Sequence, residues 1–141
     1  MTYLMKMRIR HLLGVKFFLG VAIIYTIALT FISLVEKVNL SKINISFNDK
    51  IAHFLAYFIL ASLWTIYLNS KLNKPPLKKI FLLIIPLGFF YGIIIEVLQK
   101  QITETRNADV FDAIANFTGL VVGVLLIWFV KQYFLKLKSR N

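Results

Sequence analysis

Apolar and polar positions along the chain occur in long blocks rather than in the short repeat of a half-buried strand. Four near-continuous apolar stretches cover residues 17–35, 51–68, 80–98 and 113–130, and each is 18 or 19 residues long. At about 1.5 Å per residue, a helix of this length spans the roughly 30 Å hydrocarbon layer of a membrane. The pattern therefore predicts an all-α protein in which four transmembrane helices form a bundle.

The alternative is a soluble bundle of buried helices, which would need a polar outer face on each helix. The four stretches supply almost none. Composition agrees, because 59% of the 141 residues are apolar and the mean hydropathy is +0.76, whereas ordinary soluble domains are about half apolar. The lipid bilayer is thus the first predicted partner, and residues 1–141 are predicted to form a single integral membrane domain.

Basic residues before the first stretch resemble the start of a secretory signal. These are Lys6, Arg8 and Arg10. The apolar run that follows is longer than the roughly 7–15 residues of such a signal, and no small-residue cleavage site follows Val35. We therefore expect an uncleaved signal anchor.

Charge predicts the orientation of the bundle. The chain has 17 Lys and Arg against 6 Asp and Glu, a formal net charge of +11. With four spans, both termini and the middle connection share one side, and that side holds twelve of the basic residues against five on the other. The positive-inside rule then predicts that both termini are cytoplasmic. We assign the excess charge to anionic lipid of the inner leaflet and predict no nucleic-acid partner.

Polar residues recur at the helix ends that this orientation places outside. Asp49 and His53 are four residues apart, so the carboxylate could orient the imidazole. Glu96 is predicted to point into the bundle, because a carboxylate facing lipid is costly. The candidate polar site comprises Asp49, Lys50, His53, Tyr57, Glu96, Gln99, Arg106, Asp109, Asp112 and Asn116.

Glycines follow the polar residues deeper into two of the helices. Gly88 and Gly92 precede Glu96 at steps of four, and Gly119 and Gly123 follow Asn116 at steps of three and four. Glycines at this spacing allow a second helix to approach closely. We therefore expect the third and fourth helices to pack glycine to glycine, which would bring Glu96 near Asp112 and Asn116.

Arg106 is the only arginine on the predicted outer side. It could form an ordinary surface ion pair, worth under about 1 kcal/mol. It could also clamp a phosphate, pyrophosphate or carboxylate, because the guanidinium fork suits such anions. Spacing leaves both interpretations open.

Three motifs in this order resemble the VanZ-like family of small multi-pass membrane proteins. They are D-K-x-x-H-F-x-x-Y from Asp49, E-x-x-Q from Glu96, and R-x-x-D-x-x-D-x-x-x-N-x-x-G from Arg106 to Gly119. The resemblance covers about residues 49–123. It implies a bacterial protein of the cytoplasmic membrane, in a family whose founding member is associated with teicoplanin resistance, and it names no reaction. The chain departs from the expected pattern at residues 100–105, which contain neither proline nor an aromatic residue.

Three functions from different classes fit these observations. The favoured one is a protein that binds or modulates an envelope amphiphile at the outer leaflet, either a lipid-linked cell-wall intermediate or a glycopeptide antibiotic. Arg106 would meet an anionic headgroup, and the region of Phe54, Tyr57, Gly88 and Gly92 would hold the lipid tail. For this function we assign no catalytic residue and predict neither a cofactor nor a bound metal.

The second function is a membrane-embedded hydrolase or transferase acting on a lipid headgroup. Glu96, Asp109, Asp112 and His53 would then supply acid and base groups or bind a divalent metal. It ranks second, because the chain contains neither HExxH nor GxSxG. The third function is purely structural, with the polar residues bonding the helices together at about 0.6 kcal/mol each. No oligomeric state is predicted.

Overall fold

The computed structural model describes residues 3–34, 46–72, 75–102 and 110–140. These residues form four helices and no strand: α1 (Tyr3–Leu34), α2 (Ser46–Lys71), α3 (Leu77–Ile102) and α4 (Val110–Lys138). Each helix contains a segment long and apolar enough to cross a membrane. The predicted all-α class with four candidate membrane spans is therefore confirmed.

The helices extend beyond the apolar stretches that predicted them. α1 begins at Tyr3 rather than at residue 17, and α4 continues to Lys138 rather than ending at residue 130. Lys and Arg are good helix formers, so backbone hydrogen bonding continues past the apolar residues. Pro76 directly precedes α3, and its carbonyl accepts a hydrogen bond from the backbone N–H of Lys79 (3.0 Å) in the first turn of that helix.

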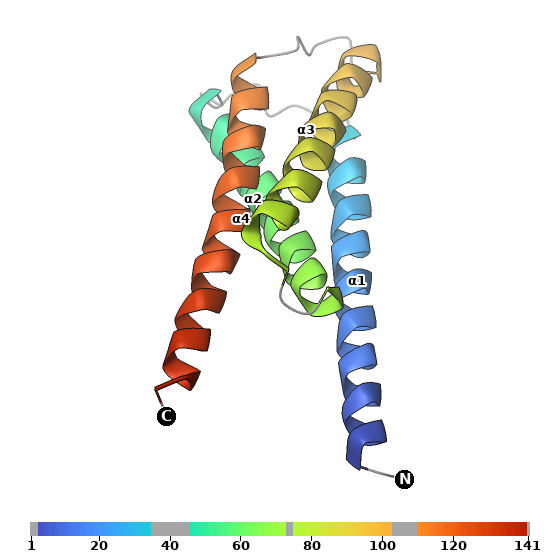
Figure 1. Cartoon of the computed structure of the whole chain (residues 1–141). Helices are drawn as coiled ribbons and strands as arrows, with labels where there is room; N and C mark the ends of the chain where they lie inside the picture. Colours follow the sequence, from blue (N-terminus) through green and yellow to red (C-terminus); the bar gives the residue numbers. More distant parts are fainter. Residues whose placement is uncertain (1–2, 35–45, 73–74, 103–109, 141) are drawn as a thin grey trace.

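α2 and α3 each contact all three other helices, and α2 packs most extensively, chiefly against α4. Figure 1 shows α1 and α4 on the two sides of α2, diverging toward the end of the molecule where both termini lie. α1 is the most peripheral, since 11% of its apolar span is buried against 28–33% for the other three. Each helix therefore turns a large part of its surface outward.

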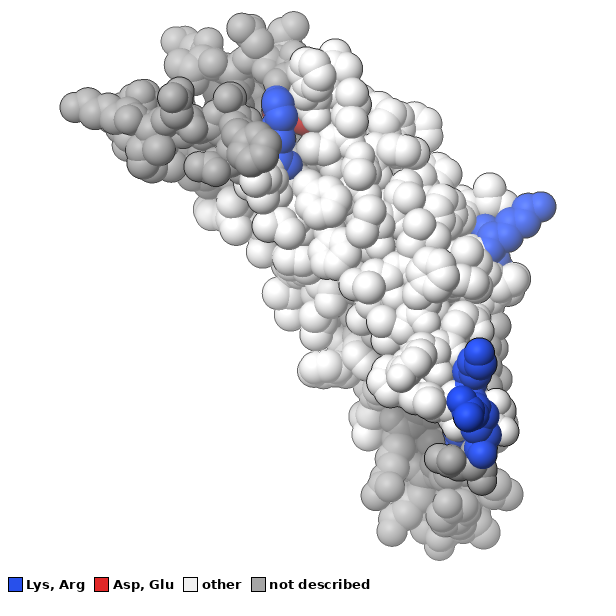
Figure 2. Space-filling view, turned by 90° about the vertical axis from the view of Figure 1, so that its left-hand side faces the viewer, with Lys and Arg blue, Asp and Glu red and all other residues white. Residues whose placement is uncertain are grey.

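The outward surface is mainly apolar. Phe31, Ile24 and Leu87 are about 70% exposed, and many other large apolar side chains are exposed as well. On the face drawn in Figure 2, Lys and Arg form small patches separated by a broad uncharged surface. Exposed apolar area on this scale needs lipid as its solvent. The interior is small by comparison, and its core is formed by Tyr57, Leu60, Ala61, Ile80, Ile84, Leu120 and Val124.

The glycines of α4 face α2, not α3. A Cβ atom on Gly119 would overlap the carbonyl oxygen of Phe54 and lie 2.9 Å from the backbone nitrogen of Phe58. A Cβ on Gly123 would lie 2.5 Å from the carbonyl oxygen of Phe58 and 3.1 Å from the Cβ of Ala61. These two glycines allow the backbones of α2 and α4 to approach closely.

The predicted glycine-to-glycine packing of α3 on α4 is therefore wrong. Gly88 of α3 faces the side chain of Leu120, whose Cδ2 would lie 2.5 Å from an added Cβ. Gly92 faces Tyr57 at 3.3 Å and Asn116 at 3.5 Å. The physical reason is that the α3 glycines make room for side chains of α4 and α2, whereas the α4 glycines make room for a backbone.

Polar side chains hold α1 against α2 and α3. The hydroxyl of Tyr25 donates to the carbonyl of Ala56 (2.9 Å), and the indole N–H of Trp64 donates to the hydroxyl of Thr26 (3.2 Å). The hydroxyls of Thr30 and Tyr91 are hydrogen-bonded at 2.9 Å. Such bonds matter in a membrane, where apolar surface alone gives helices little reason to associate.

Candidate functional site

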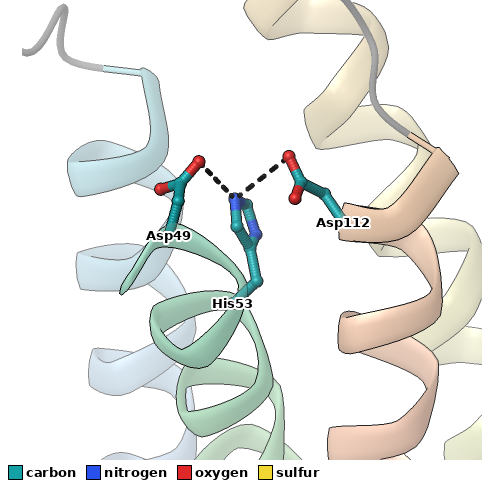
Figure 3. Close-up of side chains that lie close together, drawn as sticks. All are labelled: Asp49, His53 and Asp112. Carbon is teal, nitrogen blue, oxygen red and sulfur yellow. Dashed lines mark ion pairs between the residues drawn. The ribbon is translucent and has the colours of Figure 1, made fainter. Parts of the chain in front are cut away.

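The first turns of α2 and α4 each carry an aspartate, Asp49 and Asp112 respectively. A carboxylate near a helix N-terminus is stabilised by the helix dipole. The close approach of the two helices at Gly119 and Gly123 brings their first turns together, so the aspartates lie on facing helices (Figure 3). The local sequence thus explains each carboxylate, and the packing of α2 on α4 explains their proximity.

The imidazole of His53 lies between the two carboxylates (Figure 3). Its Nε2 is 3.9 Å from Oδ2 of Asp49 and 3.8 Å from Oδ2 of Asp112. Its Nδ1 is 3.2 Å from Oδ1 of Asn116, one turn after Asp112 on α4. The side chain of His53 is 14% exposed, so its position is largely determined by these contacts and by packing.

Lys50 neutralises one of the two aspartates. Its Nζ is 3.3 Å from Oδ1 of Asp112 and lies 5.3 Å from the ring centroid of Phe111. The side chain of Asp112 is 12% exposed, and a carboxylate so buried needs a charged partner. The two oxygens of Asp112 therefore have different neighbours, Lys50 on one side and His53 on the other.

Gln99 connects α3 to α1. It is buried, and its side-chain amide donates to the backbone carbonyl of Ser33 at 2.7 Å. Ser33 lies in the last turn of α1, where carbonyls have no partner within the helix. No residue of α1 is among those predicted for the site. The available signal was the spacing of Thr26, Thr30 and Ser33 along one face of that helix.

A cavity of about 110 Å³ opens between the four helices beside His53. We call it the polar cavity. Its polar lining comes from every helix and consists of Ser33, Asp49, His53, Tyr57, Glu96, Gln99 and Asn116.

A second cavity of about 310 Å³ lies farther along the same helices, and we call it the apolar cavity. Its lining includes Leu60, Trp64, Leu83, Leu87, Tyr91 and Leu120. The two linings are consecutive along α2. Ala56 and Tyr57 line the polar cavity, and Leu60 and Trp64 line the apolar cavity. The rings of Tyr57 and Tyr91, 6.0 Å apart, stand where the two linings meet.

Most of the residues predicted for the site can now be located. Direct contacts join Lys50, His53, Asp112 and Asn116, and Asp49 approaches His53. Tyr57, Glu96 and Gln99 line the polar cavity. Arg106 and Asp109 lie outside the described residues. Among the described residues, the ligand atoms of Asp49, His53 and Asp112 lie within 4.8 Å of one another, close enough to surround one metal ion.

Comparison with protein families identifies the chain. A family model described as VanZ/LLP1 matches residues 9–131. The chain belongs to the VanZ/LLP1 family. This match confirms the resemblance drawn from the motifs and extends it over α1, which those motifs do not include. Together with the four candidate spans, it makes the chain a multi-pass membrane protein of that family. No curated protein and no solved structure matches the chain at a significant level.

Proposed function

We propose that this VanZ/LLP1 protein binds an envelope amphiphile at the outer leaflet, with the polar headgroup in the polar cavity and an alkyl chain in the apolar cavity. The single observation that supports the proposal is the succession of the two cavities along the same four helices. An amphiphile needs this arrangement, in which polar groups fix a headgroup and apolar side chains surround its tail.

The charge of the polar cavity indicates the kind of headgroup. Its described lining carries the carboxylates of Asp49 and Glu96 and the imidazole of His53, with no Lys or Arg among the described lining residues. Carboxylates accept hydrogen bonds, so hydroxyl and amine groups suit this lining. Sugar headgroups of lipid-linked cell-wall intermediates and of glycopeptide antibiotics offer both. Arg106 is proposed for a phosphate or carboxylate of the same ligand.

Trp64 offers a direct test, because it lines the apolar cavity. The chain has two tryptophans, so Trp128→Phe leaves Trp64 as the sole fluorescent probe. The purified variant is kept in detergent with chelator present. Three ligands are titrated separately: teicoplanin, teicoplanin lacking its acyl chain, and a polyprenyl-pyrophosphate-linked disaccharide. We expect saturable quenching or a spectral shift of Trp64 with at least one acylated or prenylated ligand and a much weaker response to the deacylated glycopeptide.

Two neighbouring leucines give a matched pair of variants. Both are exposed on α3, but Leu83 lines the apolar cavity and Leu82 is not part of the lining. Leu83→Phe should weaken binding by roughly tenfold because it occupies space needed by the alkyl chain, and Leu82→Phe should leave binding unchanged. Equal responses to acylated and deacylated glycopeptide, together with no response to the prenylated ligand, would contradict the proposal.

A further inference from the structure

We infer that Asp49, His53 and Asp112 form a binding site for one divalent transition-metal ion. The inference goes beyond the proposed amphiphile binding and does not depend on it. It also goes beyond the favoured sequence prediction, which assigned no metal, and its ligand set differs from the one considered for the second function, which did not include Asp49. It starts from the geometry in Figure 3, where two carboxylate oxygens from two helices face one imidazole nitrogen.

Asn116 favours one tautomer of His53. The Oδ1 atom of an amide only accepts hydrogen bonds, so a hydrogen bond with Nδ1 of His53, 3.2 Å away, requires the tautomer with its hydrogen on Nδ1. In the neutral ring the Nε2 atom then presents a lone pair. That lone pair faces two carboxylate oxygens, and a cation bound between the three atoms would be coordinated by all of them.

The separations suit a shared metal better than direct hydrogen bonds. The Nε2 atom lies 3.9 Å and 3.8 Å from the two Oδ2 atoms, beyond the roughly 2.7–3.2 Å of an N–H to oxygen bond. A metal about 2.0–2.2 Å from each ligand holds ligand atoms up to roughly 4 Å apart. The two distances from His53 therefore leave room for an ion, and all three ligand atoms lie within 4.8 Å of one another, so the two carboxylates need only draw together to complete the site.

The neighbouring residues position these ligands. Metal-bound histidines usually donate their other ring N–H to an oxygen, and Asn116 supplies that oxygen. The Nζ atom of Lys50 lies 3.3 Å from Oδ1 of Asp112, so it orients this carboxylate while Oδ2 faces the imidazole. Asn116 and Lys50 are accordingly positioning residues in this site.

The donor set indicates the class of metal. One imidazole with two carboxylates suits Zn²⁺ or Mn²⁺, because imidazole favours the former and carboxylate oxygen the latter, whereas Mg²⁺ prefers oxygen alone. Three protein ligands leave a coordination position open. Asp49 and His53 both line the polar cavity, so we place the open position there, accessible to water or to an oxygen of a bound headgroup.

The test uses the full-length protein, purified in detergent with an affinity tag that contains no histidine and stripped with a chelator. Zn²⁺ binding is measured by calorimetry and elemental analysis without any amphiphile, and Mn²⁺ and Mg²⁺ are titrated in parallel. We expect about one Zn²⁺ or Mn²⁺ per chain, little Mg²⁺ binding, and one imidazole in the X-ray absorption spectrum of bound Zn²⁺. The two proposals fail separately, because the amphiphile titration is done with chelator present and the metal titration is done without amphiphile. A negative result for amphiphile binding therefore leaves the expected metal binding unchanged.

Isosteric variants separate a metal site from general attraction of cations to an acidic cavity. Asp49→Asn and Asp112→Asn should each abolish stoichiometric binding, and Asn116→Ala should weaken it by about 10- to 100-fold. Glu96→Gln is the control, since Glu96 lines the cavity but is not a member of the ligand group. Melting temperatures measured without metal identify any variant that has unfolded. If an aspartate variant has unfolded, His53→Gln replaces it as the test of the ligand group.

Three outcomes would overturn the inference. The first is wild-type protein that binds much less than one metal ion per chain at saturation. The second is unchanged affinity in both aspartate variants, and the third is an equal loss in Glu96→Gln.

Discussion

Four polar side chains are buried among the described residues, and three of them bond to a neighbouring helix. Gln99 donates to Ser33 of α1, Asp112 accepts from Lys50 of α2, and Asn116 meets His53 of α2. The exception is Thr65, whose hydroxyl is fully buried without a hydrogen-bond partner among the described residues. An unsatisfied hydroxyl is costly where water is excluded.

Thr65→Val should therefore stabilise the protein by about 1 kcal/mol, because it removes an unpaired polar group and keeps the shape of the side chain. The measurement is the melting temperature in detergent. Thr26→Val is the matched control and should lower it, since the Thr26 hydroxyl donates to the carbonyl of Ala22 (2.7 Å) and accepts from Trp64 (3.2 Å). A lower melting temperature for Thr65→Val would reveal a partner for its hydroxyl, such as a buried water.

Glu96→Gln separates a functional cavity from polar residues that only hold helices together. The glutamine keeps the size of the side chain and its capacity for hydrogen bonds, and it removes a charge that is costly to bury. We expect the melting temperature to hold or rise while amphiphile binding weakens. If loss of binding in this variant were matched by a proportional loss of stability, the structural reading would be favoured over the binding site.

Residue-level prediction from the sequence succeeds where a relation is local and fails where it crosses helices. The approach of Asp49 to His53 follows from their spacing of four residues on one helix. The bonds from Asn116 to His53 and from Gln99 to Ser33 depend on how α4 and α1 are rotated about their own axes. Those rotations are set by packing of the whole bundle, which no single stretch of sequence encodes.

At the scale of elements, helix number is predictable and helix partners are not. In a bilayer every backbone N–H and C=O group must be hydrogen-bonded within the segment, so a long apolar run forms a helix. The glycine stripe on α4 correctly signals a close contact, but it carries no information about which helix fills it. Ala61 and Ser62 give α2 small side chains opposite Gly123, and these make α2 the partner.

One substitution at two glycines tests this packing. Gly119→Ala should destabilise the protein by about 1–3 kcal/mol, because the new methyl group meets the backbone at Phe54 and Phe58, which cannot move aside as a side chain can. Gly20→Ala should be neutral or stabilising by up to about 1 kcal/mol, since nothing lies within 4 Å of its added Cβ and alanine favours helix.

Thermal melting of both variants in the same detergent checks the signs. Gly14, which also has nothing within 4 Å of an added Cβ, provides a second control. Equal melting temperatures for Gly119→Ala and Gly20→Ala would mean that α2 and α4 are farther apart than described, and the contacts around His53 would then be weaker as well.

At the scale of the whole molecule, charge and fold agree on which helix ends belong together. Lys71, Lys78 and Lys79 lie at the ends of α2 and α3 that join the two helices, and Lys136 and Lys138 lie near the C-terminus. Asp49, Asp112 and Glu96 occur toward the opposite ends of their helices. Because consecutive helices run in opposite directions, a pattern along the sequence becomes two chemically different sides of one bundle.

Cytoplasmic termini remain the prediction that links this asymmetry to function, because the proposed binding of an envelope amphiphile needs the polar cavity to face outward. The chain contains no cysteine, so single cysteines can be introduced without a background. Asn107→Cys should be labelled in intact cells by a membrane-impermeant maleimide, whereas Ser139→Cys should be labelled only after the cells are opened. The twelve-to-five division of basic residues is the physical reason, since Lys and Arg are retained on the cytoplasmic side. The reverse labelling pattern would place His53 and the polar cavity on the cytoplasmic side. The lipids available in that leaflet differ from those of the outer leaflet. An envelope ligand would then be excluded, although metal binding at Asp49, His53 and Asp112 would still be expected.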